Sequence, residues 1–219
     1  MRQDPPDAII FDLDGTLVDT VAARISAWRE TFADSGIAVA EGQLEPMIGM
    51  DGRALAREVV GGSGRTLADA EAERIDRLAG ERFDDHNHTP IPLPGARAAL
   101  ERLDRAGVTW AIATSSRAEQ VTASVRALAL PRPPRIVDGS RVVHAKPAPD
   151  LLLLAASELR VDPARAWYVG DSTWDMGAAV AAGMRPIGVL AGAAVDEGAL
   201  REAGAALVLA TLAELELPS

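Results

Sequence analysis

The 219-residue sequence predicts an α/β protein with a parallel sheet and a small all-helical domain inserted after the first strand. One short apolar run at residues 9–11 is followed by a long stretch in which only helical patterns occur. Beyond residue 95, apolar strand-like runs alternate with helices of about a dozen residues, which is typical of βαβ units. We therefore expect residues 1–19 and 89–219 to form the α/β core and residues 20–88 to form a helical cap domain.

The first strand and the inserted helices follow from local patterns. Residues 9–11 are a short apolar run, which is typical of a buried strand. Residues 20–34 predict a helix, because apolar side chains recur at spacings of four, three and four on one stripe: Val21, Ile25, Trp28 and Phe32. Gly36 is a plausible end of that helix. Residues 43–85 continue as helical pieces interrupted by "GMDG" and "GGSG", and the prolines of residues 90–95 mark the return to the core.

The remaining core elements alternate in order. We expect helices at 96–107, 118–128, 151–159, 174–183 and 196–204, and strands at 108–114, 166–170, 185–190 and 205–210. Ligands of open parallel α/β sheets bind beyond the carboxyl ends of the strands. The residues that follow each strand are therefore the candidate functional residues.

Composition narrows the class of protein. Apolar residues make up 48% of the chain, and there is no cysteine, which excludes disulfides, zinc–thiolate sites and a cysteine nucleophile. The net charge of −10 argues against nucleic acid and against anionic membranes as partners. No apolar run approaches the roughly 20 residues of a membrane span, and the N-terminus lacks a signal-type apolar region. We expect a cytoplasmic protein that is a monomer or a homodimer and acts on a small molecule.

Acidic and hydroxyl side chains follow three predicted strands: Asp12, Asp14, Thr114, Ser115 and Asp171. One lysine, Lys146, lies in the loop before the predicted helix at 151–159. Asp12 and Asp14 lie two residues apart at the end of the first strand, so they share a face and repel each other unless a cation lies between them or one of them holds a proton. Converging carboxylates are typical of a Mg²⁺ site. A magnesium ion, a lysine and hydroxyl groups together suit phosphoryl transfer. One aspartate could act as the nucleophile and a second could transfer protons.

Four segments of the chain resemble the motifs of the haloacid dehalogenase (HAD) superfamily. They are "DLDGTLVDT", "ATSS", "KPAPD" and "GDSTWD", which occur in the order of that family and cover the whole α/β part. The helical insertion after the first motif resembles the subfamily with a C1-type helical cap. The nearest likeness is to phosphoglycolate-phosphatase-like and β-phosphoglucomutase-like members. The resemblance implies a Rossmann-like core and a magnesium cofactor.

The resemblance also implies roles for the catalytic residues. Asp12 matches the nucleophile and a magnesium ligand. Asp14 matches the general acid/base, and its backbone carbonyl also binds magnesium. Lys146 matches the cation that steadies both the nucleophile and the phosphate. True dehalogenases lack the second aspartate, so its presence favours the chemistry of phosphate esters.

Binding roles follow in the same way. Thr114 matches the hydroxyl that holds the phosphoryl group, with the backbone N–H of Ser115 beside it. Asp171 matches a magnesium ligand, and Asp175 matches its partner, acting directly or through water. Arg53, in the cap segment "IGMDGRALARE", is the candidate that contacts the substrate, because a guanidinium suits a carboxylate or a phosphate. An exposed helix-surface arginine is an equal alternative for Arg53, and a solvated helix position is an alternative for Asp175.

These residues predict a magnesium-dependent phosphatase of small phosphate esters, with phosphoglycolate, sugar phosphates and nucleoside monophosphates left open as substrates. A phosphomutase and a non-catalytic HAD-fold binding protein are the alternatives. Two departures disfavour the mutase: Arg24 stands where mutases have a histidine, and Gly170 replaces an acid. Asp19 is expected to cap a turn or a helix. His144 lies two residues from Lys146 and receives no role.

Overall fold

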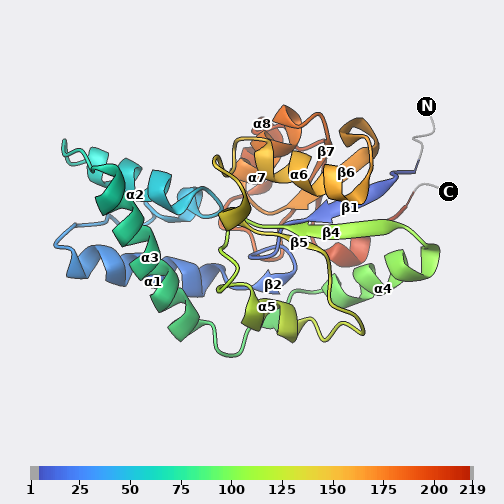
Figure 1. Cartoon of the computed structure of the whole chain (residues 1–219), viewed down its shortest axis with the longest axis horizontal. Coiled ribbons are helices and arrows are strands. Elements are labelled where there is room, and N and C mark those ends of the chain that lie inside the picture. The colour runs from blue at the N-terminus through green and yellow to red at the C-terminus, as the bar shows by residue number, and fades with distance from the viewer. Residues whose placement is uncertain (1–4, 218–219) are drawn as a thin grey trace.

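A six-stranded parallel sheet lies at the centre of the computed structural model, which describes residues 5–217 (Figure 1). Its strand order is β5-β4-β1-β6-β7-β8, so β1 is flanked by β4 and β6 and all three are hydrogen-bonded in parallel. The strands are β1 (Ala8–Phe11), β4 (Thr109–Ala113), β5 (Ile136–Val137), β6 (Ala166–Gly170), β7 (Arg185–Val189) and β8 (Leu207–Leu209). The predicted fold class is confirmed.

Helices cover both faces of this sheet, as the alternating side chains of β1 require. Ile9 and Phe11 face one hydrophobic cluster, which α4 and the ends of α5 complete, whereas Ile10 faces a second cluster with α6 and α7. The core helices are α4 (Ala96–Ala106), α5 (Thr122–Ala127), α6 (Asp150–Leu159), α7 (Thr173–Ala181) and α8 (Glu197–Glu202). Short 3₁₀ helices are η1 (Glu45–Met47), η2 (Gly139–Arg141), η3 (Pro163–Arg165) and η4 (Leu212–Glu214). Because both faces are covered, β1 is completely buried.

Three helices pack into a separate layer beside the sheet, at the left of Figure 1. They are α1 (Val21–Asp34), α2 (Gly52–Gly61) and α3 (Asp69–His86), and they share a hydrophobic cluster of their own. Trp28 stacks on Phe32 within this cluster, with ring centroids 5.4 Å apart. Both residues belong to the predicted apolar stripe of α1. The division of the chain at residues 20 and 88 stays a prediction that these contacts support.

A two-stranded antiparallel ribbon joins the helical layer to the sheet. It pairs β2 (Val18–Asp19) with β3 (Ile91–Pro92), and sequence patterns did not predict it, because two residues are too few to show a period. The predicted role of Asp19 as a cap of α1 is wrong. Thr20 occupies the position before α1, and Asp19 is an exposed residue of β2.

The predicted helix at 118–128 is shorter than expected and begins only at Thr122. The preceding residues form a turn instead, because the side chain of Gln120 accepts a hydrogen bond of 3.0 Å from the backbone N–H of Arg117. The backbone N–H of Gln120 in turn donates to the Arg117 carbonyl at 3.0 Å. This turn directs the side chain of Arg117 toward the helical layer, where it meets α3.

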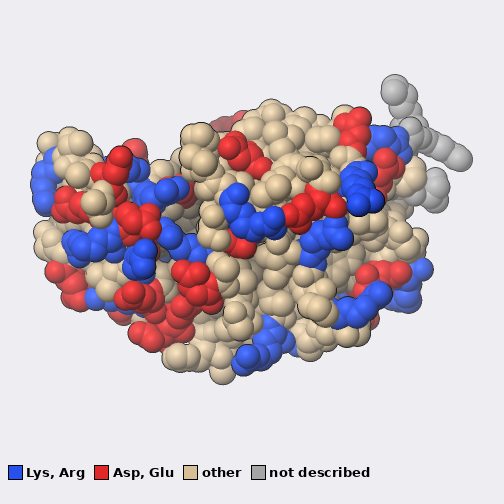
Figure 2. Space-filling view, viewed as in Figure 1, with Lys and Arg blue, Asp and Glu red and all other residues tan. Residues whose placement is uncertain are grey.

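The surface of the helical layer carries both signs of charge. Figure 2 shows Lys and Arg interspersed with Asp and Glu over these helices. Cross-helix pairs account for part of the pattern: Arg82 with Asp34, and His86 with Glu30 at 3.1 Å. Exposed pairs of this kind contribute roughly 0–1 kcal/mol each. Within residues 5–217, no helix combines the length and the apolar character that crossing a bilayer requires.

Candidate active site

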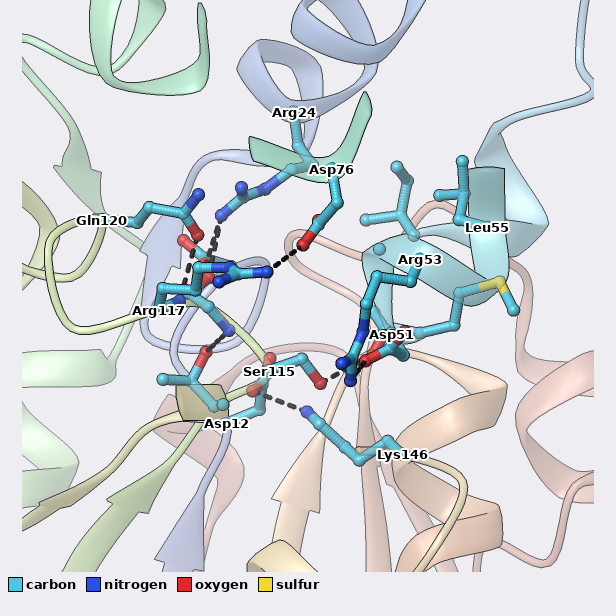
Figure 3. Close-up of a pocket in the computed structure, with 18 of the residues that line it drawn as sticks. Asp12, Arg24, Asp51, Arg53, Leu55, Asp76, Ser115, Arg117, Gln120 and Lys146 are labelled. Carbon is cyan, nitrogen blue, oxygen red and sulfur yellow. Dashed lines mark hydrogen bonds and ion pairs between the residues drawn. The ribbon is translucent and has the colours of Figure 1, made fainter. Parts of the chain in front are cut away.

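A cavity of about 290 Å³ opens at the carboxyl ends of the central strands and is roofed by the helical layer (Figure 3). Asp12 follows β1, Thr114 follows β4 and Asp171 follows β6, and all three line the cavity. The parallel register of these strands brings their ends together. The cavity therefore lies where parallel α/β sheets bind their ligands.

Lys146 occupies the floor of this site and is fully buried. Its Nζ donates to Asp12 Oδ1 at 2.7 Å, to Asp175 Oδ1 at 2.6 Å and to the Tyr168 hydroxyl at 3.1 Å. Burial alone would lower the pKa of Lys146, but the charges of Asp12 and Asp175 outweigh it and raise the pKa. Lys146 is therefore a permanent cation that holds one oxygen of Asp12 in a fixed position.

Three carboxylates exceed the one ammonium that lies among them. Asp12, Asp171 and Asp175 each offer an oxygen within 4.8 Å of the others, and all three are buried. Burial raises the pKa of Asp12 to about 7, and the nearby charge of Asp175 adds to the effect. Burial and the charges of Asp175 and Asp12 raise the pKa of Asp171 well above its usual range. Such a surplus of buried negative charge, made of oxygen ligands only, fits a hard divalent cation.

Glycines allow these carboxylates to come close to the backbone. A Cβ on Gly15 would lie 2.3 Å from Asp171 Oδ2, and a Cβ on Gly170 would lie 2.4 Å from Asp175 Cβ. Asp175 also forms a capping box at the start of α7, in which the Ser172 backbone N–H donates to Asp175 Oδ2 at 3.0 Å. Steric demand explains why a glycine stands at position 170, where the resemblance to the mutases would have an acid.

Asp14 also lines the cavity and is held by partners from both layers. Thr20 Oγ1 donates to Asp14 Oδ1 at 2.9 Å, and Arg24 Nη2 lies 3.1 Å from Asp14 Oδ2. Ser116 Oγ donates to the same oxygen and accepts from Arg24 at 2.8 Å. The guanidinium of Arg24 stacks over the Phe83 ring, 3.4 Å from its centroid. Arg24, which stands where the mutases have a histidine, is thus the direct partner of the candidate acid/base.

The loop after β4 connects the site to its roof. The Thr114 backbone N–H donates to the Val137 carbonyl at 3.0 Å, which ties the loop to β5. Thr114 Oγ1 accepts from the Ser116 backbone N–H at 3.2 Å, as a local turn does. Ser115 Oγ donates to the Gly49 carbonyl of the helical layer at 3.1 Å. Thr114 and Ser115 both face the cavity, where the resemblance placed them.

The segment around Gly49 closes the cavity from above. Trp174 Nε1 donates to the Pro46 carbonyl at 2.9 Å, from α7 to η1. A Cβ on Gly49 would lie only 2.6 Å from Ser172 Oγ, so this loop presses directly on the core. Both contacts lie beside Asp175, the acid in the first turn of α7. A lid seated in this way excludes water from a reactive site.

Arg53 lines the cavity but is engaged by a neighbour. Its Nη2 lies 2.9 Å from Asp51 Oδ2, and Asp51 also accepts a hydrogen bond from the backbone N–H of Ala54 at the start of α2. Arg117, which sequence analysis did not single out, lines the same cavity and reaches Glu73 and Asp76 on α3. Figure 3 shows Arg53, Arg117 and Asp76 above Asp12 and Lys146.

Two further polar residues escaped sequence analysis although they support the acidic cluster. Thr16 Oγ1 donates to Asp171 Oδ1 at 2.7 Å, and the Tyr168 hydroxyl contacts Asp175 Oδ1 at 3.1 Å. Thr16 belongs to the first motif itself, so its place in "DLDGT" was an available signal. Nothing distinguished Tyr168 from a packing residue of β6. His144 is exposed, lies 3.2 Å from Asp150 and is absent from the cavity lining.

Comparisons with known proteins agree with this geometry. The family model of haloacid dehalogenase-like hydrolases matches residues 9–189. Hexitol phosphatase A of Escherichia coli is 34% identical over 180 residues, covering 82% of this chain and 81% of that protein. A phosphoglycolate phosphatase of Mesorhizobium japonicum is 32% identical, covering 83% and 81%. The crystal structure of a hydrolase from Pseudomonas syringae has a TM-score of 0.90 and 34% identity, covering 94% of each chain.

Proposed function

We propose that this chain, which belongs to the haloacid dehalogenase-like hydrolases, is a magnesium-dependent phosphatase that forms an aspartyl-phosphate on Asp12. The relatives named as phosphatases place the chain among the phosphoric monoester hydrolases. One observation carries the mechanism. Asp12 and Asp14 line a single cavity, and each is held by its own cation, Lys146 for the first and Arg24 for the second. Two carboxylates in different surroundings can take different roles.

In the first step, a free oxygen of Asp12 attacks the phosphorus atom as the bond to the ester oxygen breaks. Lys146 fixes the other oxygen of Asp12, so the attacking oxygen is oriented before the substrate arrives. Thr114 and the Ser115 backbone N–H hold the phosphoryl oxygens. Asp14 gives its proton to the departing ester oxygen, which leaves as an alcohol.

In the second step, the aspartyl-phosphate is hydrolysed. Asp14, now ionised, takes a proton from a water molecule, and the hydroxide attacks phosphorus while the bond to Asp12 Oδ breaks. Inorganic phosphate leaves, Asp12 returns as a carboxylate and Asp14 is protonated again. Arg24, Thr20 and Ser116 keep the Asp14 carboxyl in place through both steps, because they contact both of its oxygens.

The residues that would hold Mg²⁺ are Asp12, Asp171 and Asp175, with the backbone carbonyl of Asp14. The surplus of buried carboxylates and the raised pKa of Asp12 and Asp171 support this assignment. A magnesium ion bound there would neutralise charge on the carboxylates and on the phosphoryl oxygens. Lys146 cannot do this alone, because it is one positive charge among three acids.

The substrate is a small phosphorylated metabolite. A cavity of about 290 Å³ lies at the lower end of the range of small-ligand sites, roughly 300–1,000 Å³. The relatives named above are a hexitol phosphatase and a phosphoglycolate phosphatase, which act on small phosphate esters.

Hydrolysis of a panel of phosphate monoesters, with Mg²⁺ and with chelator, tests the proposal. We expect phosphate release that depends on Mg²⁺, and acid-stable phosphate on the quenched wild-type protein. Asp12→Asn should lose turnover by at least about 10³-fold while its circular dichroism is unchanged, and Asp19→Asn, an exposed position of the same segment, is the matched control. Full activity of Asp12→Asn would overturn the mechanism. A requirement for a sugar bisphosphate, with isomerisation instead of release, would indicate a phosphomutase.

A further inference from the structure

The roof of the cavity contains arginines whose charge is already neutralised. Arg53 approaches Asp51 with two nitrogens, Nη2 at 2.9 Å and Nε at 3.3 Å. Burial raises the pKa of Asp51, but the hydrogen bonds from Arg53 and Ala54 outweigh it and lower the pKa overall. Asp51 therefore remains a carboxylate. Both residues of this ion pair line the cavity, so an incoming anion meets a pair and not a free guanidinium.

Arg117 is neutralised in the same way, by two acids of α3. Its Nη2 lies 2.6 Å from Asp76 Oδ2 and 2.9 Å from Glu73 Oε1. Burial raises the pKa of Asp76, although the hydrogen bond and the charge of Arg117 oppose it. All three side chains line the cavity, and Figure 3 shows Asp76 reaching toward Arg117. This part of the roof carries one positive and two negative charges.

The third arginine of the lining, Arg24, is bound to Asp14 at 3.1 Å. Of the residues that line the roof, two are arginines and three are acids, in addition to the Arg24–Asp14 pair. Glu73 also lies 3.7 Å from Arg77, which is outside the lining. Lys146, the remaining cation of the cavity lining, is enclosed by Asp12 and Asp175 on the floor. Among the described residues that line the cavity, every cation has a carboxylate within 3.1 Å.

This charge distribution selects among substrates that share the reacting phosphate. A second anionic group would have to displace a carboxylate from an arginine and would then face that displaced charge. A hydroxyl group has no such cost, because it can donate to Asp51 or Asp76 and accept from the unused N–H groups of Arg53 or Arg117. Carboxylate–arginine pairs are therefore suited to a neutral, hydroxyl-bearing group.

We propose that the leaving group of the substrate is an uncharged polyhydroxylated alcohol, such as the polyol of a sugar-alcohol or sugar monophosphate, and not one that carries a second carboxylate or phosphate. This inference rests on the proposed phosphatase function and specifies its substrate class. Asp51 and Asp76 are the specificity-determining residues, because they set the charge that the far end of the substrate meets.

Two esters of matched size provide the test. 2-Hydroxyethyl phosphate and 2-phosphoglycolate have the same two-carbon skeleton, but one ends in a CH₂OH group and the other in a carboxylate. We expect kcat/KM of the wild-type enzyme, with Mg²⁺, to be at least about tenfold higher for 2-hydroxyethyl phosphate. Glycerol 3-phosphate should be preferred to 2-phosphoglycolate in the same way.

Asp51→Asn should shift this ratio toward 2-phosphoglycolate by about tenfold, because it releases Arg53. Asparagine keeps the size of Asp51 and can still accept from the Ala54 backbone N–H, so α2 retains its cap. Asp76→Asn is the second variant and should shift the ratio in the same direction. Asp69→Asn is the control: it breaks the exposed pair with Arg57, outside the cavity, and should leave the ratio unchanged.

Three outcomes are distinguishable. A wild-type preference for 2-phosphoglycolate would overturn the inference while leaving the phosphatase function intact. A ratio that is equal in wild type, Asp51→Asn and Asp76→Asn, with all three folded by circular dichroism, would also overturn it. Failure to hydrolyse any phosphate ester of the panel would refute the proposed function itself, and the inference with it.

Discussion

The substitution Asp12→Asn should stabilise the metal-free protein while it abolishes turnover. Asp12 is buried beside Asp175 and Asp14, and its pKa rises from 3.8 to about 7. The folded state therefore retains a proton that the unfolded chain releases near pH 3.8. As pH rises from about 4 through 7, the unfolded state is increasingly favoured, and this stability is lost. Asparagine has nearly the shape of the carboxyl group but carries no charge.

The magnitude follows from the same pKa. At ~1.4 kcal/mol per pKa unit, a rise from 3.8 to about 7 lowers the free energy of unfolding by about 4 kcal/mol at pH 8, relative to acidic pH where Asp12 is protonated in both states. The amide of asparagine adds an NH₂ group beside the Lys146 ammonium, and an unpaired buried donor costs about 1–3 kcal/mol. We therefore expect a net gain of about 1–3 kcal/mol in the free energy of unfolding at pH 8. At pH 5 the gain should be smaller by about 2–3 kcal/mol.

Urea unfolding with chelator present, at pH 8 and at pH 5, measures this difference. Asp19→Asn is again the matched control, since it removes an exposed carboxylate of the same segment. Excess Mg²⁺ should reverse the order of stability, because the wild type has the full set of ligands and gains free energy from binding. An Asp12→Asn protein that is less stable than the wild type at pH 8 without metal, or equally shifted at both pH values, would refute this account of the site.

Three other predictions concern the same acidic cluster. Lys146→Met should lower the free energy of unfolding by about 3–5 kcal/mol in urea titrations and remove activity, because it leaves buried carboxylates without their cation; an active and stable variant would contradict the role of this lysine. Gly170→Ala should cost about 1–3 kcal/mol and reduce kcat, since its Cβ would lie 2.4 Å from Asp175 Cβ, whereas Gly61→Ala, with nothing within 4 Å, should not destabilise the protein. Added Mg²⁺ should raise the melting temperature more at pH 8 than at pH 5.5 in differential scanning fluorimetry, because Asp12 must lose its proton to bind the ion; an equal rise at both pH values would argue against Asp12 as a ligand.

The sequence predicted the parts of this protein that local patterns determine. Apolar runs identified the central strands, and the rule for parallel sheets brought the residues after β1, β4 and β6 to one edge. The motifs could therefore place Asp12, Asp171 and Lys146 in one site. Their distances and charge balance could not be predicted, because a pKa depends on burial and on neighbours that are remote in the chain.

Other features depend on tertiary contacts that no local pattern encodes. The turn closed by Gln120 shortens α5 and directs Arg117 toward α3. There Arg117 pairs with Glu73 and Asp76, which lie 44 and 41 residues earlier in the chain. Arg53 was expected to be either a substrate contact or an exposed residue. It lines the cavity, is half-buried and is paired with Asp51, two residues earlier in the sequence, a pairing that sequence analysis did not predict. Residue types indicate which charges are present, but only the packed structure shows which of them are already satisfied.

The ribbon of β2 and β3 has a consequence for the timing of the reaction. The ribbon begins four residues after Asp14, the candidate proton donor, and Asp14 is itself bridged to Val18. The linkage between lid and core and the candidate proton donor therefore belong to one short segment of chain. Thr20 and Arg24 lie on the lid side of that linkage, while Ser116 lies on the core side. Swinging the lid away would pull apart the groups that grip Asp14. An open lid would admit a new substrate but leave Asp14 without the partners that position it, so substrate entry and proton transfer would require different positions of the lid.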